Sequence, residues 1–232
     1  MPHWRALLLI YRRLNVELPA SQGAARFQHE LTEAEIANAT RSFAALPELV
    51  ERLSNQETSL CYDVRIVEGA LTSLNGHVDH GLYPWLSDTW KELESVFASR
   101  TYDSVFVFWP QTDFTANARV PGEFWGLGAG PDESTNGATF AVVGNAPLSS
   151  WDTPVVGEVW LHEWLHGVCR IFEARGYTMP EHDADAGGRH GYIQSPTTGW
   201  TDFYRDLMTG QVLEGNERTG IPPEAWRGHS RI

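Results

Sequence analysis

The sequence contains little cysteine, almost no lysine and no long hydrophobic run. Its 2 cysteines, Cys61 and Cys169, stand far apart and do not by themselves establish a disulfide. Its apolar runs are short, residues 6–10 being an example, whereas a membrane-spanning helix needs about 20 such residues. No segment repeats at a fixed period, which excludes a solenoid. We therefore expect a protein with no membrane span.

Positive charge is also scarce. The chain has 17 Lys and Arg against 30 Asp and Glu, a formal net charge of −13, and a nucleic-acid partner would require a basic face instead. Hydrophobic residues make up 42% and aromatic residues 12% of the chain, a composition that excludes intrinsic disorder. A length of 232 residues suits one large domain or two small lobes.

The order of the expected elements is strand, helix, strand, helix, strand, strand. This order predicts an α+β fold in which helices cover a mixed β-sheet. The expected strands are residues 5–11, 60–67, 102–109 and 138–143, and the expected helices are residues 32–53, kinked at Pro47, and 87–99.

Residues 110–137 are expected to form a loop. They contain the pattern G-x-G-x-G at Gly126, Gly128 and Gly130. No further glycine follows at the dinucleotide-binding spacing, and Pro131 and acidic residues stand where a helix should begin. We therefore do not interpret these glycines as a phosphate-binding loop.

The most informative segment is an expected helix at about residues 154–175. Thr153 can cap it, Pro154 suits its first position, and Gly176 supplies a stop. Leu161, Leu165, Val168 and Phe172 would form one apolar stripe along it.

Within this helix stands the pattern H-E-x-x-H, formed by His162, Glu163 and His166. On a helix, side chains at i and i+4 lie about 5–6 Å apart, so both imidazoles can bind one zinc ion. Glu163 is offset by about 100° around the axis, which suits a general base acting on a zinc-bound water. The alternative is two ordinary surface histidines.

A catalytic zinc site needs a third protein ligand. Glu173 is too far along the same helix, about 10.5 Å past His166, to serve. Cys169 shares the histidine face but is better interpreted as a packed core residue. The chain must turn back after the helix, and the residues that it brings back include His182, Asp183, Asp185 and His190. We favour His182, and expect a carboxylate that does not bind the metal to orient a ligand imidazole.

The extended signature H-E-x-x-H-x-x-G-x-x-H is absent, because Cys169 and Phe172 stand at its last two fixed positions. A glutamate ligand is not evident either, with Glu181 only a weak candidate. The chain nevertheless resembles zincin metallopeptidases, and more closely a group of bacterial, often secreted, zincin-like domains. The resemblance rests on YDSVFVFWP (102–110), GLGAGPDESTNGATFA (126–141), GEVWLHEWLHGV (157–168), PEHDADAGGRHGY (180–192) and FYRDLMTG (203–210).

The resemblance implies a zincin-like fold with two parts. Residues 1–176 would form an N-terminal subdomain that carries the zinc helix. Residues 177–232 would form a smaller, mostly helical or irregular lobe that supplies the third ligand. The resemblance supports His182, because related domains share a His-Asp-Ala run. It also implies secretion, and a strand that pairs with extended substrate, for which residues 138–143 are the natural candidate.

The expected activity is that of an endopeptidase, which hydrolyses peptide bonds through a zinc-bound water with Glu163 as the general base that takes its proton. Tyr192 or Tyr204 could donate a hydrogen bond to the developing oxyanion, although ordinary aromatic packing is the better explanation for each. Two alternatives remain open: a binding module with a structural metal or none, and a zinc hydrolase acting on another amide bond.

Overall fold

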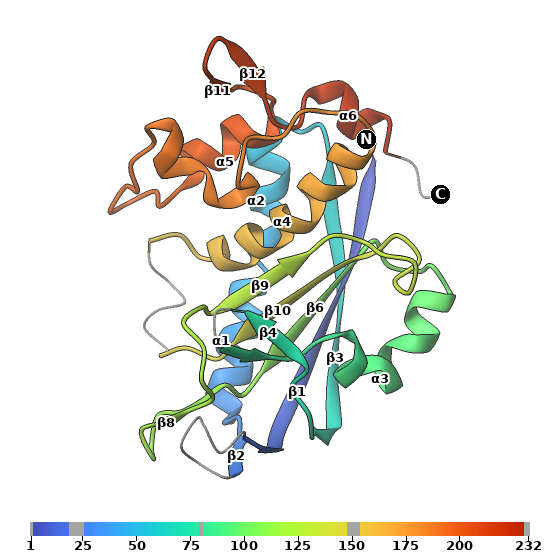
Figure 1. Ribbon diagram of the computed structural model, residues 1–232, viewed down its shortest axis with the longest axis vertical. Helices are drawn as coiled ribbons and strands as arrows, with labels where there is room; N and C mark the ends of the chain where they lie inside the picture. The colour runs from blue at the N-terminus through green and yellow to red at the C-terminus, as the bar shows by residue number, and fades with distance from the viewer. Residues whose placement is uncertain (1, 19–25, 79–80, 148–153, 230–232) are drawn as a thin grey trace.

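The computed structural model describes residues 2–18, 26–78, 81–147 and 154–229. A mixed β-sheet of six strands forms the centre of a mixed α+β fold (Figure 1). Strand β1 (His3–Glu17) runs parallel to β3 (Ser59–Leu71) on one side and to β6 (Ser104–Trp109) on the other. Strand β1 extends to Glu17, beyond the end of the strand expected at residues 5–11.

The remaining strands complete the sheet, with β9 at one edge. Strand β10 (Thr139–Gly144) runs parallel to β6, and β9 (Gly126–Ala129) pairs antiparallel with β10. Strand β2 (Arg26–Glu30) pairs antiparallel with the end of β1. Two expectations are therefore wrong. Residues 110–137 are not one loop, because they contribute β9, and residues 138–143 cannot be an edge strand, because β10 lies between β6 and β9.

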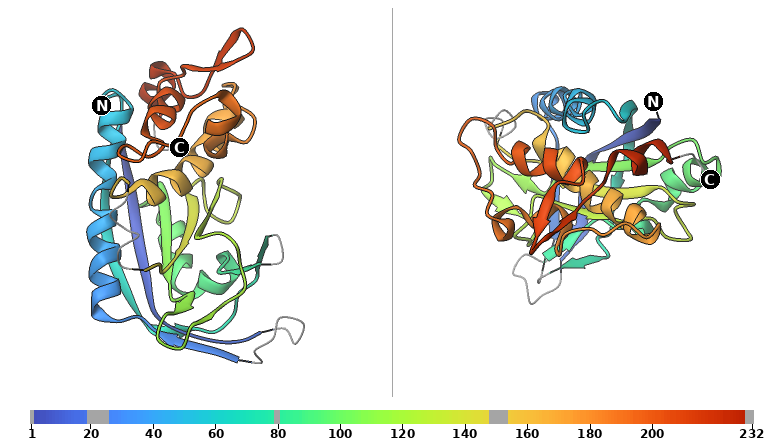
Figure 2. Two further views of the ribbon diagram at one scale, coloured as in Figure 1. Left: turned by 90° about the vertical axis from the view of Figure 1, so that its left-hand side faces the viewer. Right: turned by 90° about the horizontal axis from the view of Figure 1, so that it is seen from above.

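Strands β6 and β10 and most of β1 are buried on both faces, which explains their apolar runs, whereas much of β3 is exposed. Leu8 and Ile10 of β1 belong to one core cluster, and Leu7 and Leu9 belong to the other. Helices α1, α2 and α4 cover the first face and α3 covers the second (Figure 2). The other elements are α1 (Glu33–Phe43), α2 (Leu46–Leu53), β4 (Gly76–Val78), β5 (Gly81–Tyr83), α3 (Leu86–Ala98), β7 (Thr112–Asp113), β8 (Ala118–Arg119), α4 (Glu158–Ala174), η3 (Asp183–Asp185), η4 (Gly187–His190), α5 (Thr201–Met208), β11 (Val212–Glu214), β12 (Glu217–Thr219) and α6 (Pro223–Arg227).

Two helix boundaries differ from expectation. The expected helix at residues 32–53 is two helices, because the chain turns between them and Pro47 lies in the first turn of α2 rather than at a kink. Helix α4 begins at Glu158, not near Pro154, with Gly157 at its N-cap in the left-handed conformation at φ 88°. Thr153 lies outside the described residues. The predicted stop is confirmed, since α4 ends at Ala174 and Gly176 is left-handed at φ 92°.

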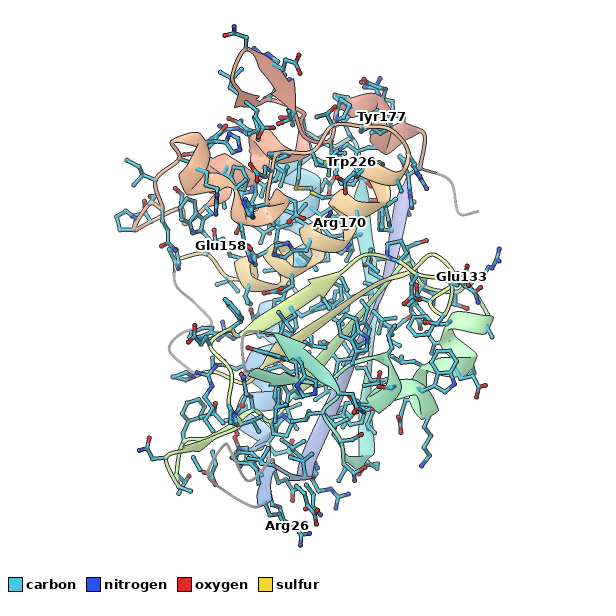
Figure 3. The ribbon with its side chains drawn as sticks, in the orientation of Figure 1. Arg26, Glu133, Glu158, Arg170, Tyr177 and Trp226 are labelled. Carbon is cyan, nitrogen blue, oxygen red and sulfur yellow. The ribbon has the colours of Figure 1, made fainter. Side chains whose placement is uncertain are left out.

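The part of the chain after α4 packs onto the sheet and α4. Trp226 of α6 stacks on Trp164 of α4 with ring centroids 6.1 Å apart, and it meets Trp4 of β1 edge-on at 6.3 Å. Figure 3 labels Trp226 beside α4, in the C-terminal part of the chain. This part therefore shares one hydrophobic core with the sheet. No helix in the described ranges has the length and apolarity needed to cross a membrane.

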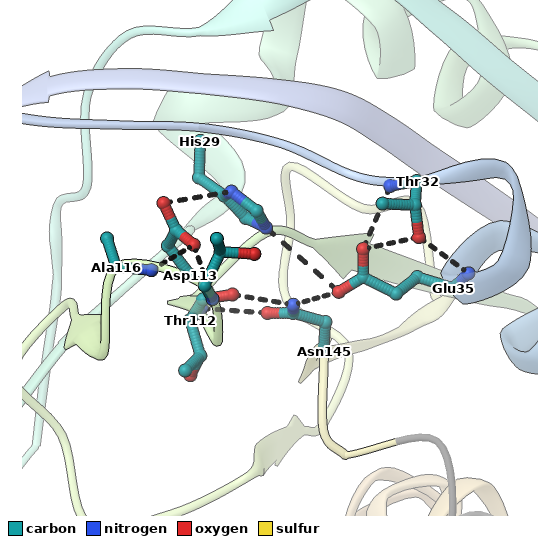
Figure 4. Close-up of polar contacts among 8 residues, drawn as sticks. His29, Thr32, Glu35, Thr112, Asp113, Ala116 and Asn145 are labelled. Atoms are coloured by element: carbon teal, nitrogen blue, oxygen red, sulfur yellow. Dashed lines mark hydrogen bonds and ion pairs between the residues drawn. The ribbon is translucent and has the colours of Figure 1, made fainter.

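A buried polar cluster joins α1 to the sheet away from α4 (Figure 4). Thr32 caps the N-terminus of α1 and forms a capping box with Glu35. The Glu35 carboxylate accepts hydrogen bonds from Asn145 Nδ2 at 2.6 Å and from the Thr32 backbone N–H at 2.8 Å, and His29 Nε2 lies 4.0 Å from it. Burial alone would raise the pKa of Glu35, but these partners outweigh burial and lower it to about 2.

Glu35→Gln should reduce stability in a pH-dependent way. A carboxyl whose pKa is depressed on folding stabilises the protein above its unfolded pKa of about 4.3 and loses this contribution as pH falls towards 2. We expect the variant to lose about 2 kcal/mol of unfolding free energy at pH 7. Its deficit relative to wild type should shrink as pH falls from 4 towards 2. Urea titrations at several pH values measure this, with the exposed Glu33→Gln as control. A deficit that does not depend on pH would contradict it.

Candidate metal centre

Helix α4 presents both histidines of the H-E-x-x-H pattern to one point. The Nε2 atoms of His162 and His166 lie 3.3 Å apart. Leu161 and Leu165, on the predicted apolar stripe, are fully buried, which fixes the rotation of the helix about its axis. The sequence therefore correctly placed these two imidazoles together, and they face away from the stripe.

Asp185 completes the cluster. Its carboxylate oxygens lie 3.4 Å from His162 Nε2 and 3.8 Å from His166 Nε2. One ligand atom from each of these three residues lies within 4.8 Å of the others, and the described residues contain no second group of this kind. The short 3₁₀-helix η3 brings Asp185 to α4 from the segment that follows it.

His182, the favoured third ligand, does not belong to this cluster. Its backbone is left-handed at φ 70°, at the residue before η3, and its Nε2 lies 3.6 Å from Glu181. His190 is also elsewhere, with its Nδ1 3.0 Å from the Leu213 carbonyl oxygen. The turn that enters η3 directs the aspartates, and not His182, toward α4. Of the candidates that the sequence offered, Asp185 is the one whose carboxylate lies beside both imidazoles.

The other nitrogen of each imidazole also has a partner. Asp183 Oδ1 accepts a hydrogen bond from His166 Nδ1. The hydroxyl of Tyr204, on α5, lies 2.9 Å from His162 Nδ1. Since a carboxylate only accepts, Nδ1 of His166 carries the proton and Nε2 can offer its lone pair to a metal. Asp183 thus occupies the position expected of a carboxylate that orients an imidazole.

The two tyrosines differ in their relation to the cluster. The Tyr204 hydroxyl contacts the Nδ1 atom of His162, on the side of the imidazole that faces away from the cluster, and Tyr204 also lines the cleft. Tyr192 donates its hydroxyl hydrogen to Asp206 at 2.8 Å and does not line the described cleft. Of the two, only Tyr204 lines the cleft, and its role towards the oxyanion stays a prediction.

Burial and neighbouring charges shift the pKa values of the cluster. Burial, followed by the nearby His166, lowers the pKa of His162 to about 4. Burial would also lower the pKa of His166, but the hydrogen bond with Asp183 outweighs it and raises this pKa. Burial raises the pKa of Glu163 to about 8, and so makes its carboxylate a stronger proton acceptor than an ordinary glutamate.

The three glycines of the G-x-G-x-G pattern let β9 lie directly against α4. A Cβ atom on Gly126 would stand 2.5 Å from Glu163 Oε1, and one on Gly128 would stand 2.1 Å from the Glu163 carbonyl oxygen. On Gly130 it would stand 2.6 Å from Arg170 Cβ. Alternate residues of a strand share a face, so the spacing of two presents a bare backbone surface to the helix. Sequence reasoning excluded a phosphate-binding role but did not find this packing role.

A cleft of about 690 Å³ opens above the cluster. Its described wall includes the edge strand β9, the first turns of α4 and the segment around η3. Its polar side chains include Glu158, which sequence reasoning did not single out. Its large exposed apolar residues are Phe124 and Trp125, at 41% and 44% exposure. Exposed apolar side chains gathered in a cleft are typical of a binding surface.

The donor set fits a zinc ion. Two imidazole nitrogens and one carboxylate oxygen are among the ligands zinc prefers. The three ligand atoms lie within 4.8 Å of one another, close enough to share one ion. Three protein ligands, rather than four, are typical of a catalytic zinc site. Cys169 does not add a fourth, because it is buried in the core, and both it and the exposed Cys61 are free thiols.

Comparisons of this chain with protein-family models, with curated proteins and with solved structures find no match. What the site can do must therefore be judged from its own residues.

Proposed function

We propose that the protein is a zinc-dependent peptidase, with His162, His166 and Asp185 as the metal ligands and Glu163 as the general base. The observation that carries the proposal is the three-residue donor cluster beside Glu163 in an open cleft. When bound, zinc would polarise the scissile carbonyl and acidify a water molecule. A zincin-like fold remains part of this proposal.

The residues of the chain perform the remaining tasks. Glu163, which lines the cleft next to the cluster, accepts the proton of the attacking water and passes it to the leaving amine. Asp183 and Tyr204 hold the two imidazoles in place through their Nδ1 atoms. Strand β9 lies at the edge of the sheet, and Gly126, Leu127 and Gly128 line the cleft. An extended peptide can therefore add to this edge through backbone hydrogen bonds.

This edge strand favours a peptide substrate over the alternatives. A binding module with a structural metal would need a fourth protein ligand, whereas the cluster formed by the described residues has three members. A hydrolase of another amide bond would have no use for a strand edge that runs along the cleft. Both alternatives are outcomes of the test below.

Removal of the metal and replacement of its ligands test the proposal. Chelation should abolish cleavage of an unstructured protein such as casein, and added zinc should restore it. Asp185→Ala should weaken zinc binding by at least about tenfold, because it removes a ligand, while His182→Ala should bind zinc like the wild type. Calorimetric zinc titrations measure both. Tight zinc binding without cleavage would favour the binding module, and zinc binding that depends on His182 would contradict this ligand set.

A further inference from the structure

Glu158 is a buried carboxyl group in the cleft that the proposed chemistry does not use. It is the first residue of α4 and stands four residues before His162, so both side chains lie on the same face of the helix. The residue is 9% exposed and lines the cleft. Figure 3 labels it at the N-terminal end of α4.

The contacts of Glu158 fix the place of its carboxylate. Its Oε1 accepts a hydrogen bond from the Trp200 backbone N–H at 2.5 Å. A Cβ on Gly199 would stand 2.2 Å from both carboxylate oxygens, so the glycine leaves them room. Burial raises the pKa of Glu158, because its effect is larger than the opposite effect of the hydrogen bond from the Trp200 backbone. A bound cation would compensate the charge that burial disfavours.

The surroundings of Glu158 are suited to a cation. The described cleft wall contains Glu158, Glu163 and Asp185 but neither lysine nor arginine. A zinc ion would offset the charges of Glu163 and Asp185, and so leave the Glu158 carboxylate as the uncompensated one. The same wall carries the rings of Trp125 and Trp200, and aromatic faces attract guanidinium groups.

We propose that Glu158 determines specificity by binding the guanidinium of a substrate arginine within the cleft. This inference rests on the proposed function, since it assumes that the cleft binds a peptide. One helical turn, about 5–6 Å, separates the Cβ of Glu158 from that of His162. A peptide extends about 3.3 Å per residue, so the arginine belongs to a residue within three positions of the scissile bond.

The alternative is a purely structural role, in which the Glu158 carboxylate holds the segment before α5 against α4 through its hydrogen bond with the Trp200 backbone. The substitution Glu158→Gln separates the two roles, because glutamine can still accept the Trp200 hydrogen bond but carries no charge. The measured quantity is the preference of the protein for arginine over citrulline, which has nearly the same shape and is neutral. A purely structural role would not change this ratio.

The experiment uses peptides in which arginine or citrulline occupies each of the three positions on either side of the scissile bond. We expect kcat/KM of the wild type to be about tenfold higher for arginine at one position, an effect typical of a partly buried charge pair. E158Q should reduce this ratio to about one. Glu173→Gln, which removes an exposed carboxylate from the same helix, is the matched control and should retain the ratio.

A ratio near one at every position in the wild type, or a ratio that survives E158Q, would overturn the inference. Equilibrium binding of the same peptides to zinc-loaded E163Q, with and without E158Q, separates it from the proposed function. An arginine preference in binding that E158Q removes supports the inference even if no peptide is cleaved, whereas binding without preference, or no binding, overturns it. If E158Q does not fold, the variant Glu158→Asp tests the inference instead. It withdraws the carboxylate by one methylene, so a shift of preference to homoarginine supports the inference and an unchanged preference contradicts it.

Discussion

Glu163→Gln should reduce kcat/KM for peptide cleavage by about 10³-fold, within the range that a general base contributes. Glutamine has nearly the same shape but cannot accept the water proton, and Glu163 is not a member of the donor cluster. Zinc content should therefore stay at the wild-type level. Peptide hydrolysis and elemental analysis of the same preparation measure both quantities.

Glu173→Gln is the control for this variant, because Glu173 is an exposed glutamate on the same helix and pairs with Arg170. It should retain wild-type activity. Near-normal cleavage by E163Q would remove Glu163 from the mechanism. Loss of zinc from E163Q would instead mean that its carboxylate supports the metal.

Gly128→Ala should destabilise the protein by about 3 kcal/mol, the upper part of the usual range for overpacking. The added Cβ would stand 2.1 Å from the carbonyl oxygen of Glu163 and 2.7 Å from His166 Cβ. Because its nearest neighbour is backbone, a rotamer change cannot relieve the clash, and β9 must move away from α4. We also expect weaker zinc binding, since His166 is displaced. Urea denaturation and zinc titration measure the two effects.

Gly69→Ala is the matched strand control. A Cβ at Gly69 of β3 meets Val67 Cγ1 at 3.9 Å, an ordinary contact. This variant should therefore keep wild-type stability to within about 1 kcal/mol. Equal stability of the Gly128 and Gly69 variants would show that β9 and α4 are not held as closely as described.

The local part of the candidate site could be predicted from the sequence. His162, Glu163 and His166 lie on one helix, where the period of 3.6 residues sets their relative directions. The apolar stripe then decides which way that face points, and the structure confirms that the stripe is buried. No knowledge of the rest of the fold was needed for this step.

The third member of the cluster could not be predicted in the same way. His182 and Asp185 are three residues apart in an irregular segment, and no period relates them to α4. The left-handed backbone at His182 and the 3₁₀ turn that follows it decide which side chain reaches the histidines. These backbone conformations depend on how residues 177–229 pack onto the shared core.

The order of the strands in the sheet also could not be predicted from the sequence pattern. The segments at residues 5–11 and 102–109 were identified as strands from their apolar runs, because burial on both faces leaves that signature. Residues 60–67 were identified as a strand from their alternation. Strand β9, with the composition of a loop, was missed. Its glycines carry no β-propensity, and their purpose becomes visible only where α4 lies against them.

The sequence by itself determined the α+β class, the amphipathic helix and the pair of imidazoles on it. Each depends on periodicity within one segment, which neighbouring residues encode. Only the tertiary structure decided that Asp185 joins the pair, that Asp183 and Tyr204 hold the imidazoles, and that β9 forms the edge of the cleft. These features join segments far apart in the chain, and their positions follow from packing around a common core.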